Sequence, residues 1–250
     1  MLSETEIKRA AVLIKESPYT VAFTGAGISV ESGIPPFRGG DGLWNKFDPS
    51  FLEIDYFYQQ PLKSWELIRK IFYQYLGKAR PNKAHDVLAR MEARKLIHAL
   101  ITQNIDNLHQ QAGNQDVIEF HGTTGRLICT ACHQTINDTA QITKLIENLP
   151  PACPECGGLL KPDFVFFSEM IPESARERSF TAAQKATVFM IIGTSGDVFP
   201  AAMLPPRSKQ TGATIIEINT APTSYTDATT DIFLEGKASV VMEAIEKALE

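Results

Sequence analysis

One histidine lies where it could transfer protons. His121 follows the largely apolar residues 117–120 and precedes Gly122. An imidazole takes up and releases protons near neutral pH, so it can serve as a general base. The apolar run and the glycine predict that His121 lies at a strand end and faces a crevice. The other histidines have ordinary structural explanations in helices, at the surface or beside the cysteines: His85, His98, His109 and His133.

Four cysteines form two pairs whose spacing is typical of a zinc site. Two residues separate Cys129 from Cys132 and Cys153 from Cys156, and twenty residues lie between the pairs. Four thiolate ligands complete the tetrahedral coordination of zinc and leave no position open for water. The sequence therefore predicts one structural zinc ion and no catalytic metal. The alternative is a set of four structural cysteines without a metal.

A glycine-rich loop is the third stretch that could do chemistry. Residues 19–23 are typical of a buried strand, and Gly25 and Gly27 follow it. Backbone N–H groups in such a loop can bind a phosphate, and Arg38 could pair with pyrophosphate charge. The spacing to Gly33 differs from the hydride-transfer fingerprint, and no acidic residue ends a second strand about 20 residues later, which disfavours a dehydrogenase. An ordinary turn is the alternative for the loop alone.

A polar cluster follows a second predicted strand. Residues 97–102 are apolar and lead directly into Gln103, Asn104 and Asp106. A buried strand rarely ends in three hydrogen-bonding side chains unless they face a polar ligand. A polar turn or a helix cap is the alternative, because Asn and Asp are common cap residues. We interpret the cluster as part of a ligand site.

The elements that must position these residues alternate between helices and strands. The predicted helices cover residues 4–16, 61–76, 82–95 and 238–249, and the further strands cover 164–167, 187–192 and 214–218. Such alternation favours an α/β fold with a mostly parallel sheet and helices on both faces. Ligands bind to this architecture beyond the carboxyl ends of the strands. Three polar segments fall there, namely 103–106, 193–195 and Asn219.

Composition excludes several classes of protein. The 250 residues carry a formal charge of −5 without a cluster of basic residues, which disfavours direct nucleic-acid binding. No apolar run approaches the ~18 residues of a membrane span. The first residues lack the features of a secretion signal, so we expect a cytoplasmic protein with reduced cysteines. The sequence makes no prediction of the oligomeric state.

Together the motifs resemble those of the sirtuin family over essentially the whole chain. The resemblance rests on Gly25-Ala26-Gly27-Ile28-Ser29, Gly33-Ile34-Pro35-Pro36-Phe37-Arg38-Gly39, Thr102-Gln103-Asn104-Ile105-Asp106, His121-Gly122, the four cysteines and Gly193-Thr194-Ser195. It implies a Rossmann-like parallel sheet with helices on both faces, plus a small zinc-ribbon and helical module. The NAD-binding domain would comprise residues 1–36, 81–122 and 161–250, with a helical insertion at 37–80 and a zinc-binding module at 123–160.

The resemblance implies NAD-dependent removal of acyl groups from lysine side chains of proteins or peptides. NAD would be consumed as a co-substrate, and the products would be free lysine, nicotinamide and O-acyl-ADP-ribose. In the family mechanism the acyl oxygen attacks the ribose carbon that bears nicotinamide. His121 would then act as the base on a ribose hydroxyl, with Asn104 and Asp106 as the other catalytic residues.

The resemblance also assigns binding residues by their motif positions. Contacts to NAD are implied for Gly25, Ala26, Gly27, Phe37, Arg38, Gln103, Asn104, Ile105, Asp106, Gly193, Thr194, Ser195, Asn219 and Ala238. Ile105 and Asp106 would bind the nicotinamide carboxamide, and Asn104 would order ribose or water. The acyl-lysine substrate would contact Phe37, Val165, Phe167 and Ser168, with the peptide added as a strand. Cys129, Cys132, Cys153 and Cys156 would bind the zinc.

Three positions depart from the family pattern. Pro36 stands where the family usually has Asp, which removes a carboxylate and a backbone N–H from the cofactor loop. Ser168 stands where many members have Gly, and Gly196-Asp197 replaces an apolar pair. We expect these departures to affect loop closure, the peptide groove or the choice of peptide.

The helical insertion predicts the acyl preference. Family members that remove succinyl or malonyl groups use a Tyr and an Arg three residues apart to hold the extra carboxylate. Alignment on Pro61 and Trp65 places Ile68 and Ile71 at these positions. Because an apolar pair cannot neutralise a buried carboxylate, we expect acetyl or longer apolar acyl groups to be preferred over succinyl. Two other functions stay open, a mono-ADP-ribosyltransferase and a non-catalytic NAD-sensing or zinc-bearing interaction module.

Overall fold

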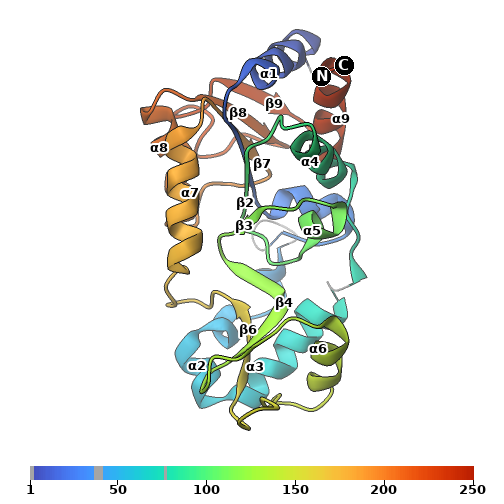
Figure 1. Ribbon diagram of the computed structural model, residues 1–250, viewed down its shortest axis with the longest axis vertical. Coiled ribbons are helices and arrows are strands. Elements are labelled where there is room, and N and C mark those ends of the chain that lie inside the picture. The colour runs from blue at the N-terminus through green and yellow to red at the C-terminus, as the bar shows by residue number, and fades with distance from the viewer. Residues whose placement is uncertain (1–2, 37–41, 76–77) are drawn as a thin grey trace.

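A computed structural model describes residues 3–36, 42–75 and 78–250. The molecule is elongated, with a large sheet and its helices at one end and a smaller part at the other (Figure 1). Among the described residues, no helix is long and apolar enough to cross a membrane.

The large sheet has six parallel strands in the order β3-β2-β1-β7-β8-β9. These are β1 (Thr20–Thr24), β2 (Ala99–Thr102), β3 (Val117–Glu119), β7 (Val188–Ile192), β8 (Thr214–Asn219) and β9 (Ile232–Glu235). The strand order reverses between β1 and β7, which is where such sheets bind ligands. Thr24 lies in register with Thr102 on β2 and with Ile192 on β7. The three loops that follow these residues therefore meet at one edge of the sheet.

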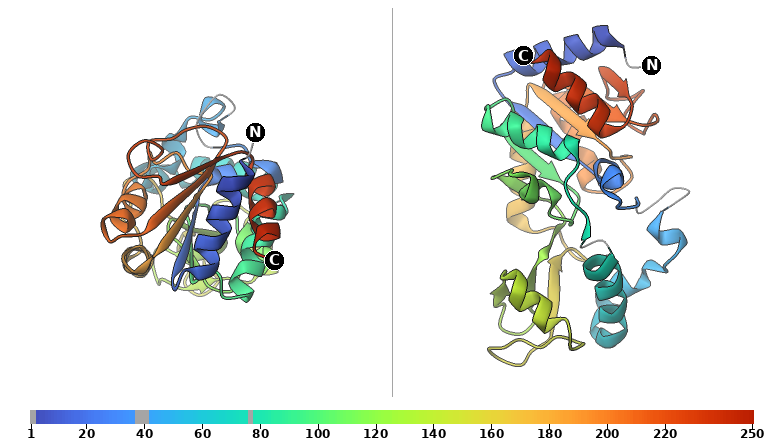
Figure 2. Two further views of the ribbon diagram at one scale, coloured as in Figure 1. Left: turned by 90° about the horizontal axis from the view of Figure 1, so that it is seen from above. Right: turned by 90° about the vertical axis from the view of Figure 1, so that its right-hand side faces the viewer.

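Helices cover both faces of this sheet, as Figure 2 shows. One face packs on α1 (Glu4–Glu16), α4 (Lys83–Ala93) and α9 (Ala238–Ala248), and the other on α7 (Glu173–Lys185) and α8 (Leu204–Gln210). Side chains alternate between the faces along each strand: Ala22 packs with the first set of helices, whereas Val21 and Phe23 pack with the second. The sequence-based prediction of a parallel sheet with helices on both faces is confirmed.

The smaller part contains a second sheet with the helices of residues 54–75 and 139–145, whereas α5 (Leu108–Ala112) packs on α4 beside the large sheet. Its antiparallel strands lie in the order β5-β4-β6. Its elements are β4 (Gly122–Cys129), β5 (Thr135–Ile136), β6 (Leu160–Phe164), α2 (Ile54–Gln59), α3 (Pro61–Ile68), a π-helical segment (Arg69–Tyr75) and α6 (Thr139–Leu145). One hydrophobic cluster joins the helices of the insertion to the cysteine-bearing strands, with Trp65 at its centre and its indole N–H donating to the Leu160 carbonyl at 2.8 Å.

Two predicted elements differ from the structure. The strand expected at residues 164–167 is wrong as a member of the large sheet, because β6 ends at Phe164 in the smaller, antiparallel sheet. Phe167 then exchanges backbone hydrogen bonds with Leu52 and Ile54, so this segment runs along the helical insertion. The helix expected over 61–76 is α-helical only to Ile68 and continues as a π-helix. Apolar periodicity does not distinguish these two kinds of helix.

Candidate functional site

Two glycine loops touch each other at the reversal point of the large sheet. Gly25 follows β1 and begins a 3-10 helix (Ala26–Ser32), and Gly193 follows β7. The Gly27 N–H donates to the Gly193 carbonyl at 2.8 Å. A Cβ added at Gly25 would lie 2.6 Å from the Thr194 Cβ, and one added at Gly27 would lie 2.6 Å from the Gly193 Cα. Only glycine permits this approach, which leaves the loop backbone free to face a ligand.

A hydrogen-bonded chain connects the polar residues after β2 to the first glycine loop. The Asn104 Nδ2 donates to the Gly25 carbonyl at 3.1 Å and to the Ser29 Oγ at 3.2 Å. Ser29 in turn donates to the Asp106 Oδ2 at 2.7 Å, and the Leu108 N–H donates to Oδ1 at 3.0 Å. Within the described residues the Asn104 Oδ1 makes no hydrogen bond, so it can accept one from a ligand hydroxyl or a water molecule.

Burial and hydrogen bonding act in opposite directions on Asp106. Burial raises the pKa of its carboxyl, whereas the bonds from Leu108 and Ser29 lower it. Both of these donors hold the carboxylate in one orientation. Ser29 is completely buried and was not among the site residues expected from the sequence. A hydroxyl residue within the Gly25–Ser29 motif was the signal that could have identified it.

The ring of His121 has a defined tautomer. Its Nδ1 lies 3.1 Å from the Gln103 carbonyl oxygen, which can only accept a hydrogen bond. Nδ1 must therefore carry the proton, which leaves Nε2 with a free lone pair. Burial lowers the pKa of His121 below its ordinary value of 6.5, and the bond to Gln103 offsets part of this effect. The ring is thus a neutral base at pH 7.

Thr194 is held from both sides of the reversal point. The Gln103 Nε2 donates to the Thr194 Oγ1 at 2.8 Å, and the Asn219 Nδ2, at the end of β8, donates to its carbonyl at 3.2 Å. Ser195 beside it is exposed. Residues that are distant in the sequence thereby form one continuous surface along the carboxyl ends of β2, β7 and β8.

The segment after β6 passes directly beside His121. The Val165 N–H donates to the His121 carbonyl at 2.9 Å. Phe167 is 38% exposed, and Ser168 adopts a left-handed conformation with φ +69. The Ser168 hydroxyl donates to the Glu53 Oε2 at 3.1 Å. This bond links the segment to the helical insertion, at the position where the family pattern has glycine in many members.

An ion pair between the buried Lys161 and the partly exposed Glu169 fixes the fold of the same segment. The Glu169 Oε2 accepts bonds from the Phe166 N–H at 2.7 Å and from the Lys161 Nζ at 2.8 Å. The Lys161 Nζ also donates to the Phe164 carbonyl and lies 4.3 Å from the centre of the Phe166 ring. Burial lowers the pKa of Lys161, and Glu169 offsets part of this effect. We call residues 165–169 the strap.

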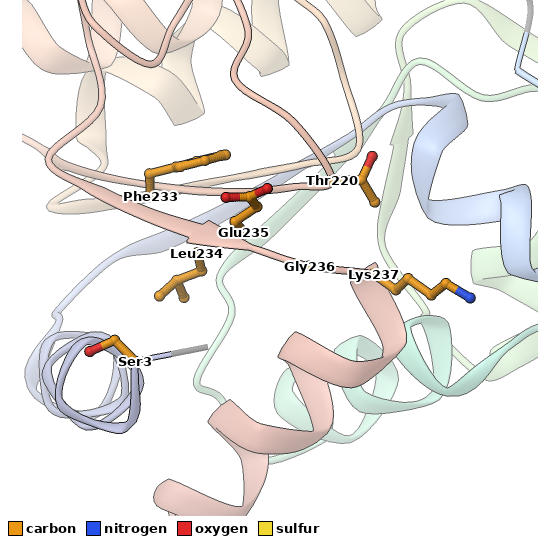
Figure 3. A pocket seen from close by; sticks show the side chains of 7 residues that line it. All are labelled: Ser3, Thr220, Phe233, Leu234, Glu235, Gly236 and Lys237. Atoms are coloured by element: carbon orange, nitrogen blue, oxygen red, sulfur yellow. The ribbon is translucent and has the colours of Figure 1, made fainter. Parts of the chain in front are cut away.

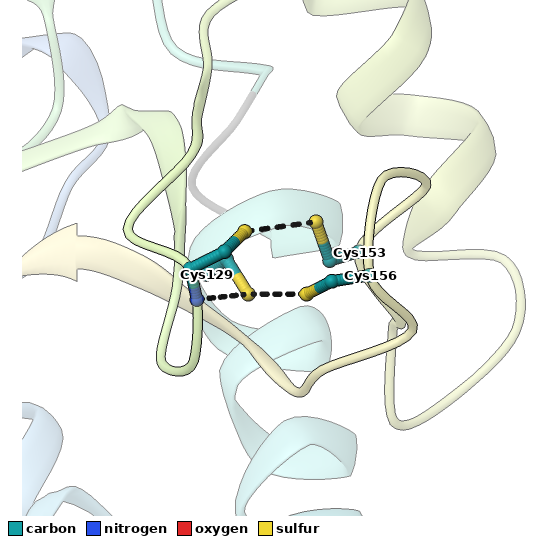
Figure 4. A group of neighbouring side chains, drawn as sticks. Cys129, Cys153 and Cys156 are labelled. Atoms are coloured by element: carbon teal, nitrogen blue, oxygen red, sulfur yellow. Dashed lines mark hydrogen bonds between the residues drawn. The ribbon is translucent and has the colours of Figure 1, made fainter.

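The four cysteine side chains converge on one point of the smaller part (Figure 4). All four sulfur atoms lie within 4.8 Å of one another. The Cys129 and Cys156 sulfurs are 3.5 Å apart, and those of Cys132 and Cys153 are 3.8 Å apart. A tetrahedral zinc site with bonds of about 2.3 Å places its sulfurs about 3.8 Å apart. The geometry of the cluster therefore fits a zinc ion.

The electrostatics of the cluster also suit a cation. Backbone N–H groups of Cys132 and Ala131 donate to the Cys129 sulfur and lower its pKa to about 6. The backbone N–H of Gln134 lowers the pKa of Cys132, but the neighbouring sulfurs raise it by more, so within the cluster Cys129 is the first thiol to ionise. Thiolates are the form that binds metal. Among the described residues this is the one group of His, Cys, Asp and Glu side chains with such a geometry.

A hollow of about 490 Å³ lies outside the crevice, where β9 leads into α9 (Figure 3). It is lined by Ser3, Thr220, Phe233, Leu234, Glu235, Gly236 and Lys237. None of the predicted site residues lines it, although Thr220 and Lys237 adjoin Asn219 and Ala238. Its exposed Glu235 and Lys237 carry opposite charges. The hollow therefore has no preference for a ligand of one charge.

The remaining predicted residues occupy varied positions. Ile105 is half-buried and packs against the hydrophobic cluster of the smaller part. Ala26 is half-buried at the start of the 3-10 helix. Ala238 begins α9 with its side chain buried in the core, so a ligand could contact mainly its backbone. Phe37 and Arg38 lie outside the described residues. The carbonyl of Pro36 accepts a bond from the Leu43 N–H at 2.9 Å.

Comparison with known proteins finds relatives over nearly the whole chain. A model of the Sir2 family matches residues 25–200. An NAD-dependent protein deacylase of Aeropyrum pernix is 44% identical over 241 residues, which cover 96% of both chains. An NAD-dependent protein deacetylase of Pyrobaculum aerophilum is also 44% identical, with 95% of this chain and 92% of that protein covered.

Solved structures share the fold at similar coverage. A complex of a Sir2 homologue with NAD has a TM-score of 0.88 and 39% identity, and covers 97% of this chain and 93% of that one. A complex of Sir2 with a p53 peptide and NAD+ has a TM-score of 0.87 and 33% identity over 96% of this chain and 97% of the other. A third, similar structure contains a deacetylated p53 peptide and 3′-O-acetyl ADP-ribose.

Proposed function

The chain belongs to the Sir2 family, and on this premise we propose that it is an NAD-dependent protein-lysine deacylase that prefers acetyl groups. Its reaction transfers the acyl group from lysine to ADP-ribose and releases nicotinamide. The observation that carries this proposal is the state of His121: a neutral ring whose proton is fixed on Nδ1 by the Gln103 carbonyl. The free Nε2 can accept a proton from a ribose hydroxyl at neutral pH.

NAD would bind along the surface formed by the two glycine loops and the ends of β2, β7 and β8. The glycines let these two loops come close to the phosphates, although the N–H groups of Gly25, Gly27 and Gly193 already donate to carbonyls within the protein. Thr194, Ser195 and Asn219 offer polar groups to a ribose. Bound there, NAD would supply the ribose carbon that the acyl oxygen attacks, and nicotinamide would leave as the glycosidic bond breaks. Asn104 would orient a hydroxyl or a water molecule through its free Oδ1. Asp106 would accept a hydrogen bond from the carboxamide N–H of nicotinamide.

The strap would bind the substrate peptide. Its neighbour on one side is His121, so an acyl-lysine that enters between Val165 and Phe167 would reach the base. Phe166 and Phe167 already use their backbone groups within the protein, so an added peptide strand would pair with the remaining backbone groups of the strap. Such pairing gives affinity for a peptide without demanding one sequence. Complexes of similar Sir2 proteins with p53 peptides support a peptide or protein substrate. Phe37 and Arg38 keep their predicted contacts as part of this proposal.

The cysteine cluster would hold one structural zinc ion. All four ligand positions are sulfur, so the metal would stabilise the smaller part and would take no part in proton transfer. One hydrophobic cluster packs the helical insertion and the cysteine-bearing strands together as one body beside the large sheet, and the division at residues 37–80 and 123–160 stays a prediction. A cytoplasmic location stays a prediction.

The acyl preference follows from the core of the helical insertion. Ile68 and Ile71 are buried with exposures of 0% and 1% in the hydrophobic cluster of the smaller part. The nearby Arg69 donates from one nitrogen to the carbonyls of Ile146 and Glu147, which directs its side chain toward these residues. A succinyl carboxylate bound beside these residues would lose its hydration without gaining a cation as a partner. An acetyl group has no charge and avoids this cost.

A matched set of peptides tests the proposal. Purified protein is incubated with NAD and with acetyl-, succinyl- or myristoyl-lysine peptides of one sequence, and the products are identified by mass. We expect nicotinamide, free lysine and O-acetyl-ADP-ribose, with acetyl turned over faster than succinyl at equal concentration. His121→Asn, which keeps a polar side chain of similar size, should abolish product formation while NAD still binds.

Two other outcomes would replace this proposal. NAD label that remains on protein would favour a mono-ADP-ribosyltransferase, because the same glycosidic bond breaks but a different nucleophile attacks. Tight NAD binding without any turnover would favour a non-catalytic sensing module. Nicotinamide release that does not depend on acetyl-peptide, or that continues unchanged in His121→Asn, contradicts a deacylase.

A further inference from the structure

Gly196 ends the loop after β7 in a backbone conformation that favours glycine. Its φ is +83, and a Cβ added there would lie 2.3 Å from the Ser224 Oγ and 2.8 Å from the Cε2 and Cζ atoms of Tyr225. The resemblance to the family predicts an apolar side chain at this position. In this chain the ring of Tyr225, which comes from the β8–β9 loop (residues 220–231), fills the space over Gly196.

Tyr225 is built into the core by both ends of its side chain. Only 3% of the residue is exposed, and its ring packs in the cluster under α7 and α8. Its hydroxyl donates to the Ala202 carbonyl at 3.3 Å. Burial, together with the negative charges of Asp197 and Glu217, raises the pKa of the phenol, so it stays a donor. The ring therefore has one fixed position against Gly196.

A buried carboxylate fastens the loop that carries Tyr225. Glu217 lies in β8 with an exposure of 0%. Its Oε1 accepts a bond from the Thr223 hydroxyl at 2.5 Å, and its Oε2 accepts bonds from Thr226 at 3.0 Å and Thr230 at 2.6 Å. Three hydroxyl donors satisfy the carboxylate without a cation. Residues on both sides of Tyr225 are thus anchored to the sheet.

The same loop contacts the segment to which NAD binding is assigned above. The Ser224 hydroxyl donates to the Ser195 carbonyl at 2.9 Å. Asn219, the last residue of β8 before this loop, donates to the Thr194 carbonyl. The backbone of Gly193 and Thr194 is therefore held by the end of β8, and that of Ser195 and Gly196 by the β8–β9 loop.

We propose that Tyr225 and Ser224 are positioning residues for NAD: they hold the Gly193–Gly196 backbone in the geometry that binds the cofactor. Tyr225 replaces, from another loop, the side chain that Gly196 lacks. The inference rests on the proposed function only for the identity of the ligand. Neither residue acts in catalysis, so their loss weakens NAD binding and leaves the chemical step unchanged once NAD is bound.

The test compares two substitutions of one residue in the full-length, zinc-loaded protein. Tyr225→Leu removes the ring over Gly196, whereas Tyr225→Phe keeps the ring and loses only the bond to Ala202. The Kd for NAD is measured by calorimetry without peptide, and KM and kcat are measured with acetyl-peptide. We expect Tyr225→Leu to raise the Kd and KM for NAD about tenfold, or about 1.4 kcal/mol. Its kcat, and all constants of Tyr225→Phe, should stay within about twofold of wild type.

Ser224→Ala is a second, milder variant that serves even if Tyr225→Leu does not fold. It removes one hydroxyl from an exposed position, and we expect the Kd for NAD to rise about threefold. An unchanged Kd in the folded variants overturns the inference, as does an equal loss of NAD and peptide affinity. Absence of turnover in wild type, with the expected changes in Kd, would contradict the deacylase and leave the positioning role intact.

Discussion

His85 makes the stability of this protein sensitive to acid. The residue is completely buried on α4, and its Nδ1 accepts a hydrogen bond from the Asn82 N–H at 3.3 Å. Nδ1 must be unprotonated to accept this bond, so the folded state holds a neutral ring. Burial lowers the pKa of His85 from 6.5 to about 4. A charged ring would lose both its hydration and the cap of the helix.

The sign and size of the effect follow from proton linkage. Below pH 6.5 the unfolded chain binds a proton at His85, whereas the folded chain does not bind it until about pH 4. The unfolded state therefore holds more protons in this window, and the free energy of unfolding falls as the pH falls. At about 1.36 kcal/mol for each pH unit, the loss reaches about 3 kcal/mol at pH 4. A typical domain has a total stability of about 5–15 kcal/mol.

Urea denaturation at several pH values between 7.5 and 4.5 measures this loss. His85→Gln removes the titrating ring but keeps an oxygen that can accept the Asn82 N–H, as glutamine does in capping boxes. We expect the stability of this variant to fall less steeply below pH 6.5 than that of wild type, by about 1.36 kcal/mol for each unit. Zinc loss and carboxylate titration are common to both proteins and cancel in the difference. Equal slopes in His85→Gln and wild type would refute the reasoning.

Three further predictions concern the site and the smaller part. Because burial lowers the pKa of His121, kcat/KM should rise through a midpoint below 6.5 and be level above it, as a pH–rate profile will reveal. Metal analysis should find about one zinc per chain, and chelation or Cys129→Ser should unfold the smaller part, seen as lost protection in hydrogen exchange. Glu169→Ala leaves Lys161 buried without its partner, so it should destabilise the protein by about 2 kcal/mol in urea denaturation and raise the KM for peptide. Glu169→Gln, which keeps an acceptor for the Phe166 N–H, should show the smaller effect on both.

The position of the crevice was predictable from local patterns. Residues 103–106 and 193–195 each follow a short apolar run, and in a parallel sheet the carboxyl ends of the strands lie at one edge. The sequence therefore indicated that these two segments lie at one crevice, and the structure joins them by a hydrogen bond of 2.8 Å between Gln103 and Thr194. The spacing of the cysteines likewise predicted that they converge on one point. Two cysteines separated by two residues can bind the same metal ion almost independently of the rest of the fold.

Contacts between residues far apart in the chain were not predictable in this way. The sequence predicts a strand at residues 164–167 because these residues are apolar. The backbone partners of Phe167 are nevertheless Leu52 and Ile54, which lie more than a hundred positions away in the chain. The tautomer of His121 depends on a carbonyl, that of Gln103, which no pattern of side chains encodes. The period of apolar residues and the secondary-structure propensities indicate which face of a segment is buried. They do not indicate which neighbouring segment forms its hydrogen bonds.

Departures from a family motif illustrate the same limit. When Gly196 alone is compared with the family pattern, the chain lacks an apolar side chain that would pack at this position. In the folded chain Tyr225, which lies 29 residues later, occupies the space, and a side chain at both positions would collide. Ser168 is similar: its left-handed backbone is unfavourable for a residue other than glycine, and its hydroxyl gains a bond to Glu53. A substitution in a motif is thus evidence of altered function only after the residue that faces it has been identified.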